Sequence, residues 1–185
     1  MKNLCQRLLA IAFVFALALP LLARPQTEEQ LIAELDSPTA KVVYAALQNL
    51  EKQYPTSAPA LAKIKTLLTD ARPTVRQKAA RVLGVLHAEV SDAELKNIAA
   101  LLDATDKTEI MEGLKALRGL KAQSIVPKIV PLLQHADSFV KRDACRTLAV
   151  IADKSVIPSI EPLLKDPDAK VQKDAGDAIS ALQAK

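Results

Sequence analysis

Residues 70–84 read DARPTVRQKAARVLG, and this stretch contains the pattern that decides the fold. Val75 is followed by Ala79 four positions later and by Leu83 eight positions later, so the three side chains lie on one face of a helix. The Asp and Pro residues that precede this stripe are typical of a turn and of the first turn of a helix. The stretch therefore predicts a turn followed by an amphipathic helix with a small residue in the middle of its buried face.

The same pattern recurs along the chain with a period of about 31–34 residues. In each aligned stretch a Val stands seven positions after a Leu, and a small residue and a branched aliphatic residue follow the Val at the same offsets. These residues are Val42, Ala46 and Leu50 in the first unit, Val140, Ala144 and Leu148 in the fourth, and Val171, Ala175 and Ile179 in the fifth. The repeat predicts stacked helix–turn–helix units, in which the small residue allows two helices to approach closely.

The third unit departs from this pattern. Glu109 and Ile110 stand where the Val is expected, and Gly113 fills the position of the small residue. Two alternatives follow: Ile110 takes the role of the Val with a shift of one residue, or Glu109 faces outward and the unit packs less well.

The first helices of the last two units share a second pattern. Their apolar stripes are Ile125, Ile129, Leu132 and Leu133 in one unit and Ile157, Ile160, Leu163 and Leu164 in the other. The first Pro of each, Pro127 or Pro158, suits the first turn of a helix. The second Pro, Pro131 or Pro162, lies four residues later and predicts a kink or a delayed start.

Composition favours helices packed on helices. Half of the residues are hydrophobic, but only 3% are aromatic, and the four glycines are too few for a fold rich in tight β-turns. The fold class that we predict is therefore all-α.

The stretch 70–84 resembles the HEAT-repeat signature, in particular the short HEAT-like class named after phycobilisome lyases. Residues 137–144 and 168–175 match it more loosely, and the resemblance covers about residues 28–185. It implies a short right-handed α-solenoid of about five HEAT-like repeats. Only the second unit keeps the family's Arg directly after the Val, at Arg76, so a regular ladder of Asp–Arg pairs between repeats is in doubt.

The N-terminus predicts export. Lys2 and Arg7 precede the apolar run 8–19, and Ala23 supplies a small residue at a plausible cleavage point. We expect residues 1–23 to be a signal peptide and residues 24–185 to form the solenoid domain, which would be periplasmic or secreted. The alternative is an uncleaved N-terminal membrane anchor.

Charge gives little support for nucleic-acid binding. Without Lys2 and Arg7 the 25 basic residues become 23 against 21 acidic ones, a net charge of +2. A nucleic-acid interface requires a concentrated basic surface and aromatic stacking platforms, and few aromatic residues remain after residue 23.

No catalytic, cofactor-binding or metal-binding residues are predicted, and we expect a protein that is not an enzyme. The two histidines, His87 and His135, are interpreted as exposed residues at helix ends. The HEAT-like family includes a di-iron hydroxylase that binds metal through His-Glu pairs, and this chain has no adjacent His-Glu dipeptide. Cys145 follows Ala144 in an apolar stripe and is expected to be a small buried core residue.

One feature is a candidate for binding. Equivalent positions of three second helices carry bases, and stacked repeats align such positions. These bases are Arg81, Lys115 and Arg146, flanked by Arg76, Lys141 and Arg142. The family resemblance places the second helices on the concave face. The row is either a docking stripe or an ordinary solvated face with interleaved acids.

These features predict an exported interaction or scaffold module that docks a partner on the concave face of its second helices. The partner expected for a basic stripe is a protein with an acidic surface or an acidic peptide. Two alternatives stay open: an accessory subunit of an enzyme, by analogy with the HEAT-like lyases, and a structural spacer.

Overall fold

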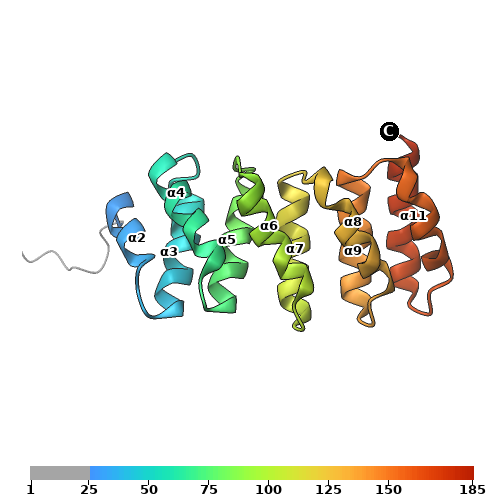
Figure 1. Cartoon of the computed structure of the whole chain (residues 1–185), viewed down its shortest axis with the longest axis horizontal. Helices are drawn as coiled ribbons and strands as arrows, with labels where there is room; N and C mark the ends of the chain where they lie inside the picture. The colour runs from blue at the N-terminus through green and yellow to red at the C-terminus, as the bar shows by residue number, and fades with distance from the viewer. Residues whose placement is uncertain (1–25) are drawn as a thin grey trace, which may run out of the picture.

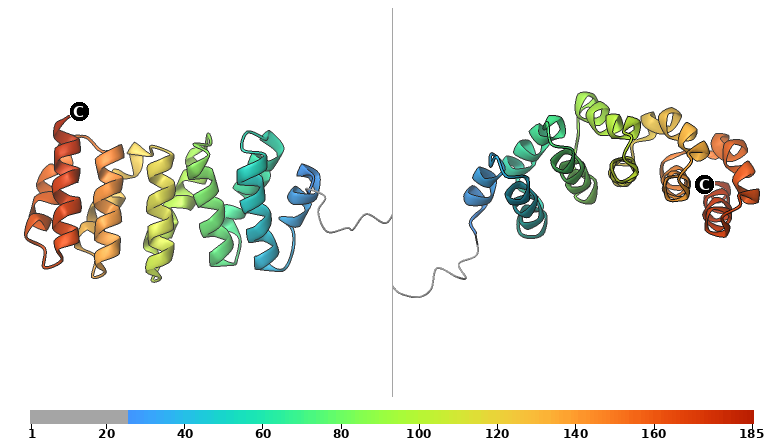
Figure 2. Two further views of the ribbon diagram at one scale, coloured as in Figure 1. Left: turned by 180° about the vertical axis from the view of Figure 1, so that it is seen from behind. Right: turned by 90° about the horizontal axis from the view of Figure 1, so that it is seen from below.

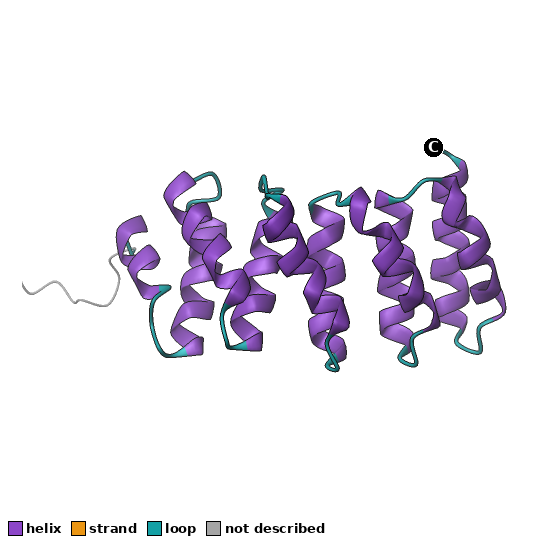
Figure 3. Cartoon of the chain, viewed as in Figure 1, coloured by secondary structure: helices purple, strands orange, loops and turns teal. Residues whose placement is uncertain are grey.

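The computed structural model describes residues 26–185. This part of the chain contains ten α-helices, six short 3₁₀ segments and no strand, which confirms the all-α prediction (Figure 3). The predicted signal peptide lies outside the described residues. Within them, no helix combines the length and apolar character that a membrane crossing requires.

The helices form five pairs, as the sequence repeat predicts. The pairs are α2 (Glu28–Glu34) with α3 (Ala40–Gln53), α4 (Ala58–Thr66) with α5 (Pro73–Val85), α6 (Asp92–Ala100) with α7 (Lys107–Gly119), α8 (Val126–Ile129) with α9 (Ser138–Ile151), and α10 (Ile157–Ile160) with α11 (Ala169–Gln183). The 3₁₀ segments are η1 (Leu67–Thr69), η2 (Leu101–Asp103), η3 (Gln123–Ile125), η4 (Val130–Gln134), η5 (Lys154–Val156) and η6 (Glu161–Lys165).

The pairs stack in one row that curves into an arc (Figures 1 and 2). The second helix of each pair lies on the inner side of the arc, and the first helix lies on the outer side (Figure 2, right). The concave face is therefore lined by α3, α5, α7, α9 and α11. The hydrophobic core of the solenoid is one continuous cluster of buried aliphatic side chains that runs from Leu31 to Leu182.

A small residue occupies the seventh position of every second helix. These residues are Ala46, Ala79, Gly113, Ala144 and Ala175, and all are buried. A Cβ atom at Gly113 would lie 2.9 Å from the Cβ atom of Leu101 in the preceding segment. The prediction that this slot lies at a close contact between helices is confirmed.

The sequence predicts that Val42 begins the buried stripe of the second helix in the first unit. In the structure Val43 takes this role. The Val42 side chain is 37% exposed, whereas Val43 is fully buried. The third position of a second helix faces the preceding repeat, as Glu109 shows by its contact with Arg76 of α5. No repeat precedes the first one in the described part of the chain, so Val42 has nothing to pack against there.

The burial of Glu109 and Ile110 decides between the two alternatives for the third unit. Ile110 is buried and takes the role of the Val with a shift of one residue, which is the first of the two alternatives. The second alternative is wrong, because Glu109 is also buried and is neutralised by the guanidinium of Arg76, 2.9 Å away.

The first helices α8 and α10 contain only one turn of α-helix each, followed by the 3₁₀ segments η4 and η6. Pro131 and Pro162 are the second residues of these segments, where proline removes the N–H that an α-helix would use. Pro127 and Pro158 lie in the first turn, as predicted. Leu164, predicted in the buried stripe, is 44% exposed because no further repeat covers the last one in the described chain.

Candidate interaction surface

The predicted row of bases exists on the concave face. Arg81, Lys115 and Arg146 occupy the ninth position of α5, α7 and α9, and these helices lie side by side on the inner side of the arc (Figure 2). Their side chains are 44%, 29% and 46% exposed, respectively. The row is therefore accessible to solvent along the middle of the solenoid.

Each base in the row also has an acidic partner. The guanidinium of Arg81 lies 3.0 Å from Glu112, the Lys115 ammonium lies 2.8 Å from the same carboxylate, and Arg146 lies 3.0 Å from Asp174. Burial raises the pKa of Glu112, but hydrogen bonds from Lys115 and then Arg81 outweigh it, so this pKa lies below its usual value. The carboxylate is ionised and shared between two cations.

The three flanking bases are less exposed. Arg76 contacts Glu109, Arg142 donates from Nε to Asp174 at 2.6 Å, and Lys141 is paired with Asp166. The side chains of Lys141 and Arg142 are only 14% and 17% exposed. These pairs join a second helix to the next repeat and leave little of the bases for a partner.

Ion pairs connect all four junctions between neighbouring repeats. Besides the pairs above, Lys78 of α5 lies 2.7 Å from Glu51 of α3, and Lys107 of α7 lies 2.8 Å from Asp137, the N-cap of α9. The described repeats are thus joined by ion pairs of mixed type, and not by the regular ladder of Asp–Arg pairs that the sequence put in doubt. These pairs were hidden in the sequence because each junction uses different residue types at different positions.

A groove of about 420 Å³ lies between α3, α5 and α7 on the concave face. Tyr44 is 48% exposed there, and the Lys78 ammonium lies 5.4 Å from the centre of its ring. Amide and charged side chains complete the lining, which includes Gln48, Gln77, Arg81 and Glu112. An exposed aromatic ring surrounded by hydrogen-bonding groups of both charges is suited to an extended peptide.

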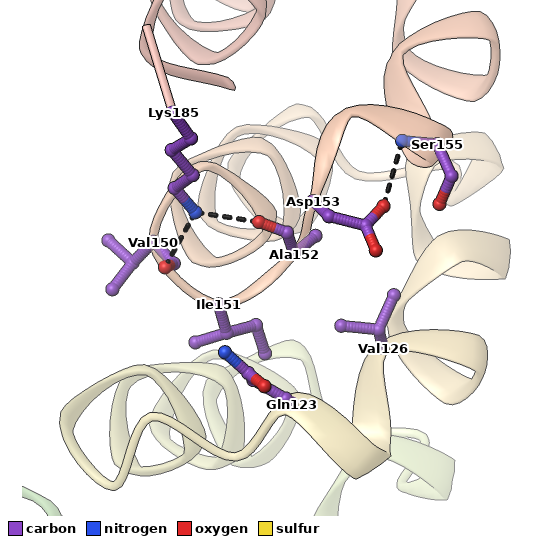
Figure 4. A pocket seen from close by; sticks show the side chains of 8 residues that line it. All are labelled: Gln123, Val126, Val150, Ile151, Ala152, Asp153, Ser155 and Lys185. Carbon is purple, nitrogen blue, oxygen red and sulfur yellow. Dashed lines mark hydrogen bonds between the residues drawn. The ribbon is translucent and has the colours of Figure 1, made fainter. Parts of the chain in front are cut away.

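A second pocket lies where α9 ends (Figure 4). Here Lys185 Nζ donates hydrogen bonds to the carbonyl oxygens of Val150 at 2.9 Å and Ala152 at 2.6 Å. Asp153 accepts a hydrogen bond from the backbone of Ser155. Lys185 therefore completes the end of α9, and Asp153 completes the start of η5 (Figure 4).

The histidines serve local structure. His87 is exposed and follows α5 with φ at 50°, and its Nδ1 lies 2.7 Å from the carbonyl oxygen of Gly119, which accepts the hydrogen bond. The prediction of an exposed helix-end residue is confirmed for His87. It is wrong for His135, which is half-buried because its Nδ1 accepts a hydrogen bond from the backbone of Asp137.

Cys145 is fully buried, as predicted. Burial, and then the nearby charge of Asp174, raises the pKa of this thiol to about 12, so it remains protonated. Among residues 26–185, no group of three or more His, Cys, Asp or Glu side chains is arranged to hold a metal ion.

A close contact between α5 and α7 is not predicted by the repeat pattern. A Cβ atom at Gly84 would lie 2.6 Å from the Cα atom of Ala116, and one at Gly119 would overlap the carbonyl oxygen of Gly84. The two backbones touch here because neither glycine carries a side chain. The signal was a pair of glycines at adjoining positions of successive second helices.

The repeat pattern, the arc and the inner row of second helices together give the described chain the architecture of an α-solenoid. Residues 94–182 match the family model described as HEAT repeats. Over these residues the chain is similar to HEAT-repeat proteins. No curated protein sequence matches the chain.

Solved structures share this α-solenoid architecture. A chain from the complex of CpcE and CpcF of phycocyanin lyase from Nostoc sp. PCC7120 superposes with a TM-score of 0.74 and 23% identity, over 91% of this chain and 70% of that chain. An engineered protein gives a TM-score of 0.64 with 26% identity, over 85% and 81%. A designed armadillo repeat protein in complex with the peptide (KR)4 gives 0.61 with 20% identity, over 83% and 80%.

Proposed function

We propose that this solenoid is a non-catalytic interaction module that docks a protein partner on the concave face of its second helices, after export from the cytoplasm. The observation that carries the docking proposal is the groove between α3, α5 and α7, where Tyr44 is exposed among amide and charged side chains. The export proposal rests on the basic start and apolar run of the first 23 residues.

The geometry favours docking over a passive spacer role. A buried Tyr would contribute to stability, but the Tyr44 ring leaves about half of its surface open on the inner face. Exposed aromatic rings in a concave surface are typical of protein interfaces. The inner helices also present several side chains in register, which suits an extended segment that crosses successive repeats.

A second candidate is an accessory subunit of an enzyme. The phycocyanin lyase chain that this solenoid resembles is found in a complex of two proteins. Under this alternative the partner on the concave face would be a catalytic subunit. A catalytic subunit would bind the same concave surface, so one crosslinking experiment tests this alternative together with the proposed docking function.

Photo-crosslinking from the two faces tests the proposal. A benzoylphenylalanine at Gln48 samples the concave groove, and one at Lys96 of α6 samples the outer layer with a similarly exposed side chain. In cells of the source organism we expect a discrete crosslinked partner from Gln48 and none from Lys96. Partners captured only from Lys96 would overturn the assignment of the surface, and no partner from either position would favour the spacer.

A further inference from the structure

A hollow of about 490 Å³ lies on the concave face where α5 and α7 end. It is separate from the groove around Tyr44, and Arg81 lies at the boundary between the two. Its lining consists of small, apolar and basic residues. They are Arg81, Gly84, Val85, His87, Lys115, Arg118, Gly119, Lys121 and Val150.

The lining contains no acidic residue. Arg81 and Lys115 share the single carboxylate of Glu112, which lies outside the lining. Arg118 and Lys121 form no side-chain ion pair or hydrogen bond with any residue in the described part of the chain. Four cationic side chains therefore converge on one hollow with one carboxylate between them, whereas the flanking bases of the row are each held by an acid of the next repeat.

Backbone acceptors in the hollow are already occupied. The carbonyl oxygen of Gly119 accepts from the His87 ring, and that of Gly84 accepts from the His87 backbone at 3.3 Å. At the end of α5 the backbone N–H of Ala88 donates a hydrogen bond to the carbonyl oxygen of Leu83. At the end of α7 the backbone N–H of Ala122 donates to the carbonyl oxygen of Leu117 in the same way. The hollow thus offers donors and positive charge, with few free acceptors, so it favours an anionic ligand.

The hollow also has an apolar part. Val85 and Val150 occupy the thirteenth position of α5 and α9 and are 45% and 46% exposed. Gly119 occupies the same position of α7 and lacks a side chain, because the backbone of Gly84 lies where its Cβ atom would be. Both valines line the hollow, so an aliphatic side chain of a ligand would cover apolar surface there, whereas a phosphate group would leave the valines in water.

We propose that this hollow binds a short acidic segment of a protein partner, with its carboxylates on Arg118, Lys121, Arg81 and Lys115 and an aliphatic side chain against Val85 and Val150. The inference rests on the proposed docking function and names the chemistry of the partner. Cations without acidic partners attract carboxylates at long range and form charge-assisted hydrogen bonds on contact.

Fluorescence anisotropy with the labelled peptide EEDVLDEE tests this inference. The variant Arg118→Glu/Lys121→Glu removes two cations that have no ion pair in the described structure, so its fold is expected to be retained. The matched control Lys165→Glu/Lys170→Glu makes the same charge change on exposed lysines of η6 and α11. Circular dichroism of all proteins verifies that both variants remain helical.

We expect the wild-type protein to bind the peptide, the Arg118→Glu/Lys121→Glu variant to bind at least about tenfold more weakly, and the control variant to stay within about threefold of wild type. The neutral peptide QQNVLNQQ should not bind. No binding of EEDVLDEE, equal losses in both variants, or displacement by inorganic phosphate at constant ionic strength would each overturn the inference. A crosslinked partner at Gln48 together with any of these results would reject the hollow and retain the docking function.

Discussion

At the scale of single residues, the glycines of this chain have different roles. Gly84 and Gly119 permit a backbone contact between α5 and α7, whereas a Cβ atom at Gly176 would meet only Leu164 Cδ2 at 3.8 Å, an ordinary contact distance. All three lie within α-helices, where glycine costs helix stability relative to alanine. Packing therefore decides which of them can be replaced.

Alanine substitutions separate these roles. We expect Gly84→Ala to lower the free energy of unfolding by about 1–3 kcal/mol, because the new methyl group overlaps the backbone of Ala116 and the helices must move apart. The control Gly176→Ala is expected to raise it by about 0.5–1 kcal/mol, because the helix gains propensity without a clash. Urea denaturation followed by circular dichroism measures both, and a stabilised Gly84→Ala protein would contradict the contact.

Two other residues show that glycine is not required where the chain turns left-handed. His87 and Lys121 follow α5 and α7 with φ at 50° and 53°. The sequence contains no glycine at these points, so the usual signal for this helix ending is missing. The hydrogen bonds that close the two helix ends stabilise the conformation instead.

At the scale of elements, second helices are joined by ion pairs whose acids are held in the charged form. The Lys141 ammonium, and then the backbone N–H of Asp168, hold the pKa of Asp166 below its usual value. The Lys107 ammonium does the same for Asp137. A folded state that binds protons less readily than the unfolded chain loses stability as the pH falls.

Asp166→Asn tests this at one junction. The folded pKa of Asp166 is depressed, so its contribution is present above its unfolded pKa near 3.8 and is lost as the pH falls through the folded value. We expect the variant to melt at a lower temperature than wild type at pH 7, and this difference to shrink below about pH 4. Asn can still accept the backbone hydrogen bond of Asp168, so the turn is retained.

The control for this experiment is Asp103→Asn. Asp103 is paired with Lys128, but its side chain is 68% exposed, and such pairs contribute little to stability. Its melting temperature should follow that of wild type at every pH. A constant difference between Asp166→Asn and wild type from pH 7 to pH 3 would show that the ion pair is not the source of the effect.

Much of the fold was predictable from the sequence, because the small residue at the seventh position of each second helix is set by local packing. The error at Val42 arose because its burial depends on a preceding repeat, and none precedes the first unit in the described part of the chain. The row Arg81, Lys115 and Arg146 was also predictable from the repeat. The partners of Arg81 and Arg146 were not, since Glu112 and Asp174 come from the following repeats at different offsets, whereas Lys115 pairs with Glu112 of its own helix.

The hollow was likewise outside what the sequence could supply. Arg118 and Lys121 belong to no repeated position, and their significance depends on where α7 ends relative to α5 and α9. A pattern of periodic positions identifies rows of residues along the solenoid. It does not identify a site made at the ends of three helices.

At the scale of the whole molecule, stability is distributed along a line, because each repeat packs mainly on its neighbours. The second, third and fourth repeats have a neighbour on both sides. The first helix of the first repeat, α2, has only seven residues and a single buried side chain, Leu31. The central helices α5 and α7 are also in backbone contact. Local opening should therefore be easiest at the α2 end of the row.

Hydrogen exchange followed by mass spectrometry measures this gradient. We expect amides of α2 to exchange at least about tenfold faster than amides of α5 and α7, since local opening near an end exposes less surface than global unfolding. A Gly84→Ala protein should lose much of the protection of α5 and α7 and little of that of α11. Uniform exchange along the chain would show that the solenoid opens as a single unit.

The contact between Gly84 and Gly119 has a consequence for recognition that extends beyond stability. Because the two backbones touch, the side chains on either side of them are brought to a spacing that no other residue pair would permit. Selection for a particular partner can therefore act on this backbone contact as well as on the side chains that bind the partner. A single added methyl group would change the curvature of the arc, and with it the set of peptides whose side chains match the inner face.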